Sequence, residues 1–303
     1  MNAYRSGFVG IVGPTNSGKS TLLNALLGKK ISIVSPRAQT TYHGIRGIET
    51  TDTEQIIYVD TPGFQRNREP VARMLNKVAD RNAKDCDLLL WVFDVSNPQF
   101  LQQIEQLKDR IAQNPPEKTF LVLNKIDKIR RSDLLPILAQ VSEKKLFGEI
   151  VPISALKNDG VERIARFLKP QLPEGQHWYA PGDITDRSQD FVLSEFIREK
   201  VYRATYEEIP YTVWVEMEKW EGLEEQKSEG KVPTFHATLH VDSESRRGIL
   251  IGKQGEMMKR IGTAARKEIE TYLGQQVCLK LHVKVQEGWR EDGRHLNRYL
   301  ELE

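Results

Sequence analysis

A glycine-rich segment of eight residues, Gly13–Ser20, has the residue types and spacing that suit phosphate binding. It matches the pattern G-x-x-x-x-G-K-[ST] and lies between a predicted strand and a predicted helix. Glycines let the backbone wrap around a phosphate chain, and the N–H groups at the start of the helix point toward it. Lys19 would contact the outer phosphates, and the Ser20 hydroxyl would bind Mg²⁺. We assign nucleotide binding in this segment to Gly13, Asn16, Ser17, Gly18, Lys19, Ser20 and Thr21.

A second segment, Asp60–Gly63, follows another apolar run and reads Asp-Thr-Pro-Gly. The Asp60 carboxylate can reach the magnesium shell, and the Gly63 N–H can contact a terminal phosphate. The same four residues also suit an ordinary turn. Because they accompany a phosphate loop, we favour the phosphate-binding interpretation.

A third segment, Asn124-Lys125-Ile126-Asp127, predicts which base is bound. The Asp127 carboxylate can accept hydrogen bonds from N1–H and the 2-amino group of guanine, whereas adenine has neither donor. Loss of such a designed hydrogen bond can reject an analogue by about 10⁴-fold, so the sequence predicts GTP rather than ATP. The later segment Ser154-Ala155-Leu156 could place a backbone N–H on the guanine oxygen; alone it also suits a plain loop, and it is convincing only in series with the other motifs.

Together these motifs, in this order, make residues 1–168 resemble the translation-factor-related GTPases, and in particular the Era family. The segment Gln39-Thr40-Thr41-Tyr42-His43 is similar to the family pattern Q-T-T-R-H, with Tyr42 in place of the usual Arg. The resemblance implies that Thr41 binds magnesium, with Thr40 as the alternative. It also implies catalytic roles for Lys19, Thr41 and Gly63.

Two further residues bear on hydrolysis. Phe64 follows Gly63, where Ras-like GTPases have the Gln that orients the attacking water. A phenyl ring cannot hold a water molecule, so the resemblance implies slow intrinsic turnover that depends on another group or a partner. Asn16 matches an asparagine that can bind K⁺ in the Era family; alternatively, it is a polar loop residue that bonds its own backbone.

These segments need elements that bring them together. Short apolar runs alternate with amphipathic stretches, which is typical of a mostly parallel sheet with helices on both faces. Ligands bind at the carboxyl ends of strands in such sheets, where all four motifs would lie. The predicted strands are FVGIVG from Phe8, QIIYVD from Gln55, DLLLWVFD from Asp87, TFLVLNK from Thr119 and IVPISA from Ile150.

The pattern changes after a Pro-rich segment, residues 169–188, which we predict to be a linker between a GTPase domain (1–168) and a second domain (189–303). The second domain begins with a predicted helix over 191–206. Alternating strands follow at YTVWVEMEK and FHATLHV, and a third, LKLHVKV, begins at Leu279. A last helix is predicted over 291–300. This order indicates a small α+β domain with one buried sheet face.

The segment Gly252-Lys253-Gln254-Gly255 separates two predicted helices in this domain. Its context of helix, loop and helix with flanking strands resembles a type II KH domain. Glycines let the loop approach a sugar-phosphate backbone, and helix ends leave N–H groups for phosphates. Basic residues outnumber acids seven to one between Arg246 and Lys267, which indicates an RNA-binding patch. We assign RNA binding to Arg246, Arg247, Gly252, Lys253, Gln254, Gly255, Lys259, Arg260 and Arg266, although Lys259 and Arg266 could equally form a solvated face. Residues Met258, Ile261, Ala265, Ile269 and Tyr272 recur at helical spacing and are predicted core.

The domain order resembles that of the Era family, which implies binding to the 3′ end of small-subunit ribosomal RNA during maturation of the small ribosomal subunit. It implies Mg²⁺ and GTP or GDP as ligands, K⁺ as a further candidate, a monomer, and a candidate peripheral association with the inner face of the cell membrane. A tRNA-modifying GTPase would need an N-terminal cofactor-binding domain and a C-terminal cysteine, and we expect neither. An RNA-binding assembly module with little GTPase activity remains the alternative.

The length and composition of the chain fit a two-domain GTPase, but they do not indicate which partner it binds. The 303 residues exceed the usual size of one compact core, and 44 Lys and Arg balance 42 Asp and Glu. No apolar run is long enough to span a bilayer, and the N-terminus lacks a signal-peptide layout. Cys86 and Cys278 have no metal-ligand spacing. We therefore expect a cytoplasmic protein with free thiols.

Overall fold

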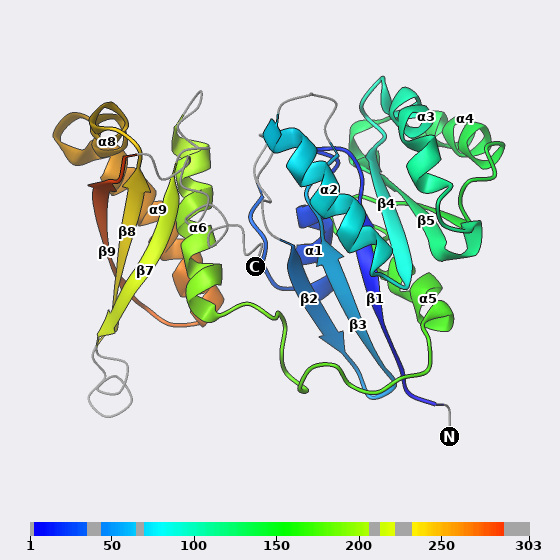
Figure 1. The fold of residues 1–303 in the computed structure, drawn as a ribbon, viewed down its shortest axis with the longest axis horizontal. Helices are drawn as coiled ribbons and strands as arrows, with labels where there is room; N and C mark the ends of the chain where they lie inside the picture. Colours follow the sequence, from blue (N-terminus) through cyan, green and yellow to red (C-terminus); the bar gives the residue numbers. More distant parts are fainter. Residues whose placement is uncertain (1–2, 35–43, 65–69, 206–212, 222–231, 288–303) are drawn as a thin grey trace. The chain divides into compact units, whose positions relative to one another are not determined.

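The computed structural model describes residues 3–34, 44–64, 70–205, 213–221 and 232–287. The chain divides into two compact units, Met1–Asp186 and Arg187–Glu303 (Figure 1). The predicted helix over 291–300 lies outside the described residues.

Unit 1 is built on a six-stranded sheet in the order β2-β3-β1-β4-β5-β6. All neighbours pair in parallel except β2, which is antiparallel to β3. Nearly every residue of β3, β4 and β5 is buried, because helices cover both faces of the sheet. The strands are β1 Arg5–Val12, β2 Ile45–Thr50, β3 Glu54–Asp60, β4 Leu88–Asp94, β5 Thr119–Asn124 and β6 Glu149–Pro152.

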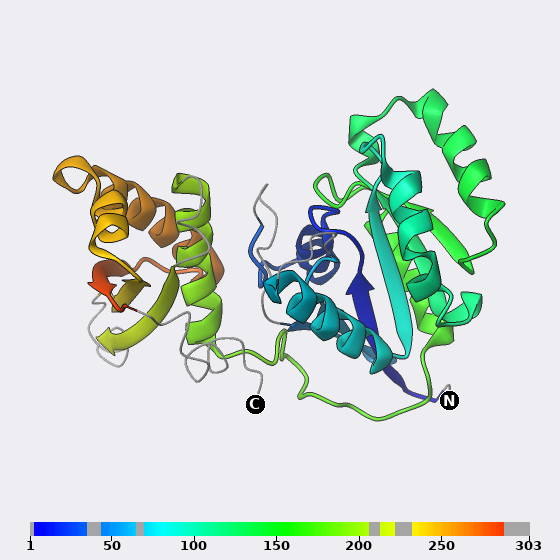
Figure 2. The same ribbon diagram turned by 45° about the horizontal axis from the view of Figure 1, so that its top comes forward.

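Helices α1 to α5 cover this sheet (Figures 1 and 2). Helices α2, α3 and α4 share one hydrophobic cluster with the sheet, around Trp91 and Phe93. Helices α1 and α5 contact each other on the opposite face. The bounds are α1 Lys19–Leu27, α2 Pro70–Lys84, α3 Phe100–Ile111, α4 Arg131–Ser142 and α5 Val161–Leu168, with 3₁₀ turns at Pro116–Lys118, Ile126–Lys128 and Lys169–Gln171. The predicted fold class, a mostly parallel sheet with helices on both faces, is confirmed.

The segment predicted as a linker is irregular after its 3₁₀ turn, yet residues up to Asp186 belong to unit 1. The buried Gln55 side chain of β3 binds this segment to the sheet. Its Oε1 atom accepts hydrogen bonds from the N–H groups of Trp178 and Tyr179, at 2.7 and 3.0 Å. Further along, the Ile48 N–H donates to the Ile184 carbonyl at 2.9 Å. Hydrogen bonds to buried partners therefore fix a segment that has no sustained hydrophobic period.

Unit 2 has a three-stranded sheet in the order β7-β8-β9, with β7 and β8 antiparallel and β8 and β9 parallel. Its strands are β7 Trp214–Glu221, β8 Thr234–Val241 and β9 Cys278–Val285. Its helices are α6 Gln189–Ala204, α8 Glu244–Ile251 and α9 Glu256–Leu273, with a 3₁₀ turn at Lys253–Gly255. This is the α+β order that the sequence predicts.

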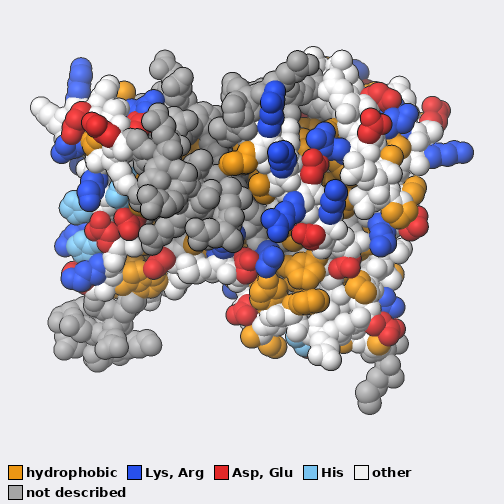
Figure 3. Space-filling model, viewed as in Figure 1, with side chains coloured by type: hydrophobic (Ala, Val, Ile, Leu, Met, Phe, Trp, Pro, Cys, Tyr) orange, Lys and Arg blue, Asp and Glu red, His pale blue; other side chains and the backbone are white. Residues whose placement is uncertain are grey.

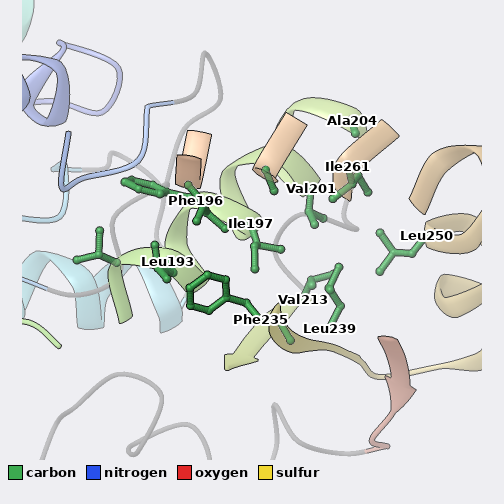
Figure 4. Packing of buried hydrophobic residues seen from close by; sticks show 14 of the residues in the cluster. Leu193, Phe196, Ile197, Val201, Ala204, Val213, Phe235, Leu239, Leu250 and Ile261 are labelled. Atoms are coloured by element: carbon green, nitrogen blue, oxygen red, sulfur yellow. The ribbon is translucent and has the colours of Figure 1, made fainter. Parts of the chain in front are cut away.

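The helices of unit 2 pack on one face of its sheet (Figure 4). On β8 the alternating residues Phe235, Ala237, Leu239 and Val241 are fully buried. They meet the predicted core positions of α9, of which Ile261, Ala265 and Ile269 are fully buried while Met258 and Tyr272 are partly buried. The alternation on the strand and the helical spacing on α9 therefore meet in one core.

Two further sequence-based expectations concern cysteines and membrane spans. Cys86 is partly buried and Cys278 is exposed, and both are free thiols. Burial raises the pKa of the Cys86 thiol to about 12. Across the described helices, none combines the length and the apolarity needed to cross a bilayer.

Candidate nucleotide site and nucleic-acid interface

The phosphate-loop lysine is buried at the first residue of α1. Lys19 is 7% exposed, and its Nζ donates to the Gly13 and Pro14 carbonyls at 3.3 and 2.8 Å. Burial lowers the pKa of Lys19 to about 8, and the Asp60 carboxylate opposes part of that shift. A cation this desolvated gains strongly from a phosphate anion, since charges attract more strongly where water is excluded.

The glycines of the loop have conformations that a side chain would resist. Gly13 and Gly18 have φ values of 141° and 95°. A Cβ on Gly18 would lie 2.3 Å from the Asn124 Nδ2 atom, which donates to the Ser17 carbonyl at 2.9 Å. Close approach of the loop to the third motif therefore requires glycine at this position.

Oxygen atoms gather beside the loop at the end of β3. The Ser20 hydroxyl donates to the Asp60 Oδ2 atom at 2.8 Å, and the buried Ser32 hydroxyl donates to the same oxygen at 3.2 Å. Asn24 fixes the Ser32 backbone by accepting from its N–H and donating to its carbonyl, at 3.0 and 2.8 Å. Hydroxyl and carboxylate oxygens are the ligands that Mg²⁺ prefers, so these residues fit a magnesium site.

The second motif lies directly against the first. The Phe64 N–H donates to the Gly13 carbonyl at 3.0 Å, and the Thr15 N–H donates to the Phe64 carbonyl at 3.4 Å. A Cβ on Gly63 would lie 2.7 Å from the Thr15 Cα and 2.9 Å from the Lys19 Nζ. Only glycine lets the backbone pass this close to the lysine that would hold the phosphates.

The Phe64 side chain is directed into the core. It is 7% exposed, stacks on Trp91 with ring centroids 5.6 Å apart, and has the Arg110 guanidinium 5.1 Å from its ring centroid. The Phe64 side chain therefore packs between the sheet and α3. This geometry agrees with the interpretation that Phe64 does not orient water.

The third and fourth motifs are joined by side-chain hydrogen bonds. Asn124 is 2% exposed, and its Oδ1 accepts from the Ala155 N–H at 3.0 Å. The Ser154 hydroxyl donates to the exposed Asp127 carboxylate at 2.6 Å. Leu156 is 71% exposed. The carboxylate that we assign to guanine recognition is therefore oriented by the fourth motif.

Sequence reasoning missed Asp94 at the end of β4. The Lys125 Nζ donates to Asp94 at 2.6 Å and to the Asn16 carbonyl at 2.7 Å. Asn16 and Lys125 both have left-handed backbone conformations, with φ of 61° and 66°. The sequence feature that could have indicated Asp94 is its position as a carboxylate at the carboxyl end of the buried strand β4. Sequence reasoning also missed Asn24, which lies within α1, and Ser32, which follows that helix, because neither belongs to a recognisable motif.

The glycine loop of unit 2 joins α8 to α9. Gly252, Gln254 and Gly255 all have positive φ, at 72°, 49° and 80°. A Cβ on Gly252 would lie 2.7 Å from that of Met257, whereas one on Gly255 meets nothing within 4 Å. Gly252 therefore closes the turn, and Gly255 leaves open space over the start of α9, where N–H groups can meet a phosphate.

The basic residues around this loop fall into two groups. Four arginines have partners within the unit: Arg246 pairs with Asp242, Arg247 with Glu244, Arg266 with Glu270, and Arg260 donates to the Ala204 carbonyl at 2.8 Å. Lys253, Lys259 and Lys267 are exposed and have no ion-pair partner in the part of the chain that the structure describes. The lysines are the basic side chains most available to an RNA phosphate.

Some predicted site residues cannot be placed. Thr40, Thr41 and the rest of the segment 39–43 lie outside the described residues.

Two families and several solved structures resemble this chain. Residues 8–125 match a family described as 50S ribosome-binding GTPase, and residues 208–290 match the KH domain. GTPase Era from Lactobacillus delbrueckii subsp. bulgaricus is 39% identical over 289 residues, covering 95% of this chain and 93% of the relative. The crystal structure of Era in complex with MgGDPNP and nucleotides 1506–1542 of 16S ribosomal RNA has a TM-score of 0.86 and 33% identity, covering 97% of this chain and 98% of that one. A variant of Aquifex aeolicus Era bound to GDP and AlF₄⁻ gives the same values.

Proposed function

Because this chain belongs to the Era family of GTPases, we propose that it hydrolyses GTP in unit 1 and binds the 3′ end of small-subunit ribosomal RNA with unit 2, in maturation of the small subunit. The related complex with 16S ribosomal RNA supports this choice. The family description that names the 50S subunit concerns unit 1 only, since it matches residues 8–125.

One observation carries the nucleotide part of the proposal. Four segments that are far apart in sequence are joined at the carboxyl edge of one sheet, and Asn124 alone bonds both Ser17 and Ala155. The phosphate-binding groups and the base-selecting groups therefore lie along the same edge of the sheet, where one nucleotide could contact both.

The ligands follow from the same contacts. Ser20 and Asp60 would hold Mg²⁺, which when bound neutralises charge on the phosphates. Lys19 would contact the outer phosphates, Gly63 would offer its N–H to the terminal phosphate, and Asp127 would select guanine. We keep Thr41 as a further magnesium ligand.

Three finer proposals come from the family resemblance. Asn16 would bind K⁺ beside the phosphates, and a second cation there would assist a site in which Phe64 replaces the water-orienting glutamine. The protein would act as a monomer in the cytoplasm. It would associate with the inner face of the cell membrane only peripherally.

A pair of variants tests whether the two activities have separate sites. Gly255→Asp adds an anion where a phosphate would approach, without a predicted clash, and should strongly weaken binding of an RNA of nucleotides 1506–1542 while GTP affinity stays unchanged. Lys19→Ala should weaken GTP binding and leave RNA binding intact when no nucleotide is present. Fluorescence anisotropy with labelled RNA and labelled nucleotide measures both.

The matched control is Gly274→Asp. Gly274 also has positive φ, at 69°, and open space around it, but it caps the opposite end of α9. That variant should bind RNA like the wild type. If Gly255→Asp and Gly274→Asp bind RNA equally well, the glycine loop is not the RNA site.

A further inference from the structure

Helix α2 carries a basic stripe, which we define as Arg73, Lys77, Arg81 and Lys84. All four side chains are exposed, and none has an ion-pair partner among the described residues. Figure 3 shows Lys and Arg side chains gathered over this helix. No function assigned so far to unit 1 uses them.

The spacing of the stripe concentrates its charge. At about 100° per residue, positions separated by four, four and three residues fall within an arc of about 80° and extend about 16 Å along the helix. Asp80 borders this arc, but it is engaged by the Arg110 guanidinium at 2.9 Å, which offsets its charge. On α3, by contrast, the exposed positions mix Glu105, Lys108 and Asp109.

Helix stability does not account for this arrangement. Arg81 and Lys84 occupy the last turn, where the helix dipole favours cations. Arg73 occupies the first turn, where the dipole disfavours a cation, and that turn contains no acid. Like charges four residues apart also repel one another by a few tenths of a kcal/mol. Helix stability therefore explains only Arg81 and Lys84, and the full row of four cations points to an external anion.

The surroundings favour a nucleic-acid backbone over a lipid surface. The apolar side chains Leu75 and Ala79 of α2 are buried, and Ala79 belongs to the hydrophobic cluster shared with the sheet. The large exposed hydrophobic residues of the described chain lie elsewhere, and Met74 and Val78 of α2 are only partly exposed, so this face offers little to insert between acyl chains. A row of exposed cations with no exposed large apolar side chain beside it matches a row of phosphates.

We propose that the basic stripe of α2 is a second RNA-binding surface, which holds the phosphate backbone of ribosomal RNA independently of sequence. It extends the proposed function by giving the GTPase unit its own RNA contact. Arg and Lys at these positions release counterions from the RNA, so their contribution falls steeply with salt.

The test replaces all four residues by glutamine, which keeps helix propensity: Arg73→Gln, Lys77→Gln, Arg81→Gln and Lys84→Gln. The matched control removes the same charge from exposed sites scattered over unit 1: Lys108→Gln, Lys118→Gln, Arg131→Gln and Arg166→Gln. Each full-length protein, fluorescently labelled and limiting, is titrated with small-subunit ribosomal RNA between 50 and 200 mM KCl. GTP affinity, expected to be unchanged, reports that unit 1 is folded.

The plot of log affinity against log salt has a negative slope. Loss of four phosphate contacts should make the slope of the stripe variant less steep than that of the wild type by about 3. Over this fourfold range of salt, the wild-type affinity should then fall about 60-fold more than that of the stripe variant. Equal slopes for the stripe and control variants would overturn the inference. So would selective loss of binding to phosphatidylglycerol vesicles with RNA binding intact, which would assign the stripe to a membrane. If the wild type itself binds no RNA, the proposed function is wrong, and this inference, which rests on it, is wrong as well.

Discussion

Raising the pH from 7 to 9 should weaken GDP binding about tenfold through one side chain, Lys19. Burial holds its pKa near 8 in the free protein, below the ordinary value of 10.5. Bound phosphates stabilise the ammonium and return its pKa toward or above the ordinary value. Below pH 8 the lysine is charged in both states. Between the two pKa values binding must take up a proton, so affinity falls as pH rises, by about tenfold or 1.4 kcal/mol at pH 9.

The assay is a titration of a fluorescent GDP analogue at several pH values with the wild type and with Lys19→Met, which keeps the stem and removes the charge. Titration of the guanine base affects both proteins alike, so the difference between the two curves isolates the lysine. The difference should shrink above pH 8. Parallel curves for the two proteins across this range would refute the reasoning, because Lys19 would then keep its charge or not meet the phosphates.

Three other substitutions test single contacts. Asp127→Asn should shift preference from GTP toward xanthosine triphosphate, because an amide can donate to the 2-oxo group; unchanged GTP affinity would remove Asp127 from the base site. Turnover should be faster in K⁺ than in Na⁺, with the difference lost in Asn16→Ala; equal phosphate release in both salts would contradict a potassium site. Asp94→Asn should raise the Kd for GTP and GDP about five- to tenfold by releasing Lys125, with kcat little changed; calorimetry that shows wild-type affinity would leave that ion pair without a role in binding.

The sequence predicts most of the architecture because the central strands of unit 1 are buried on both faces and read as apolar runs, and because strand β8 of unit 2, buried on one face, alternates. It does not reveal β2, since IRGIET is an edge strand with an exposed Arg46 and a mid-strand Gly47, and neither periodicity nor composition marks it. Nor does it show that residues up to Asp186 belong to unit 1. That packing depends on backbone groups held by Gln55, and hydrogen bonds to backbone leave no sequence pattern.

The candidate site likewise contains residues that the sequence reveals and residues that only the structure reveals. Lys19, Asp60 and Asp127 are recognisable because phosphate and guanine chemistry demand those residue types at set distances from a strand. Asp94 and Ser32 act through other side chains, Lys125 and Asp60, and many residue types could do so. Only the folded chain shows which ones are in reach.

The central claim is that one chain couples GTP hydrolysis to small-subunit RNA. Phosphate release from GTP, measured in K⁺ with and without an RNA of nucleotides 1506–1542, tests it most directly. We predict slow release by the protein alone, a faster rate with RNA, and loss of the RNA-dependent part in Gly255→Asp. Phosphate release at the level of Lys19→Ala under both conditions would contradict the claim and favour an RNA-binding module with little GTPase activity.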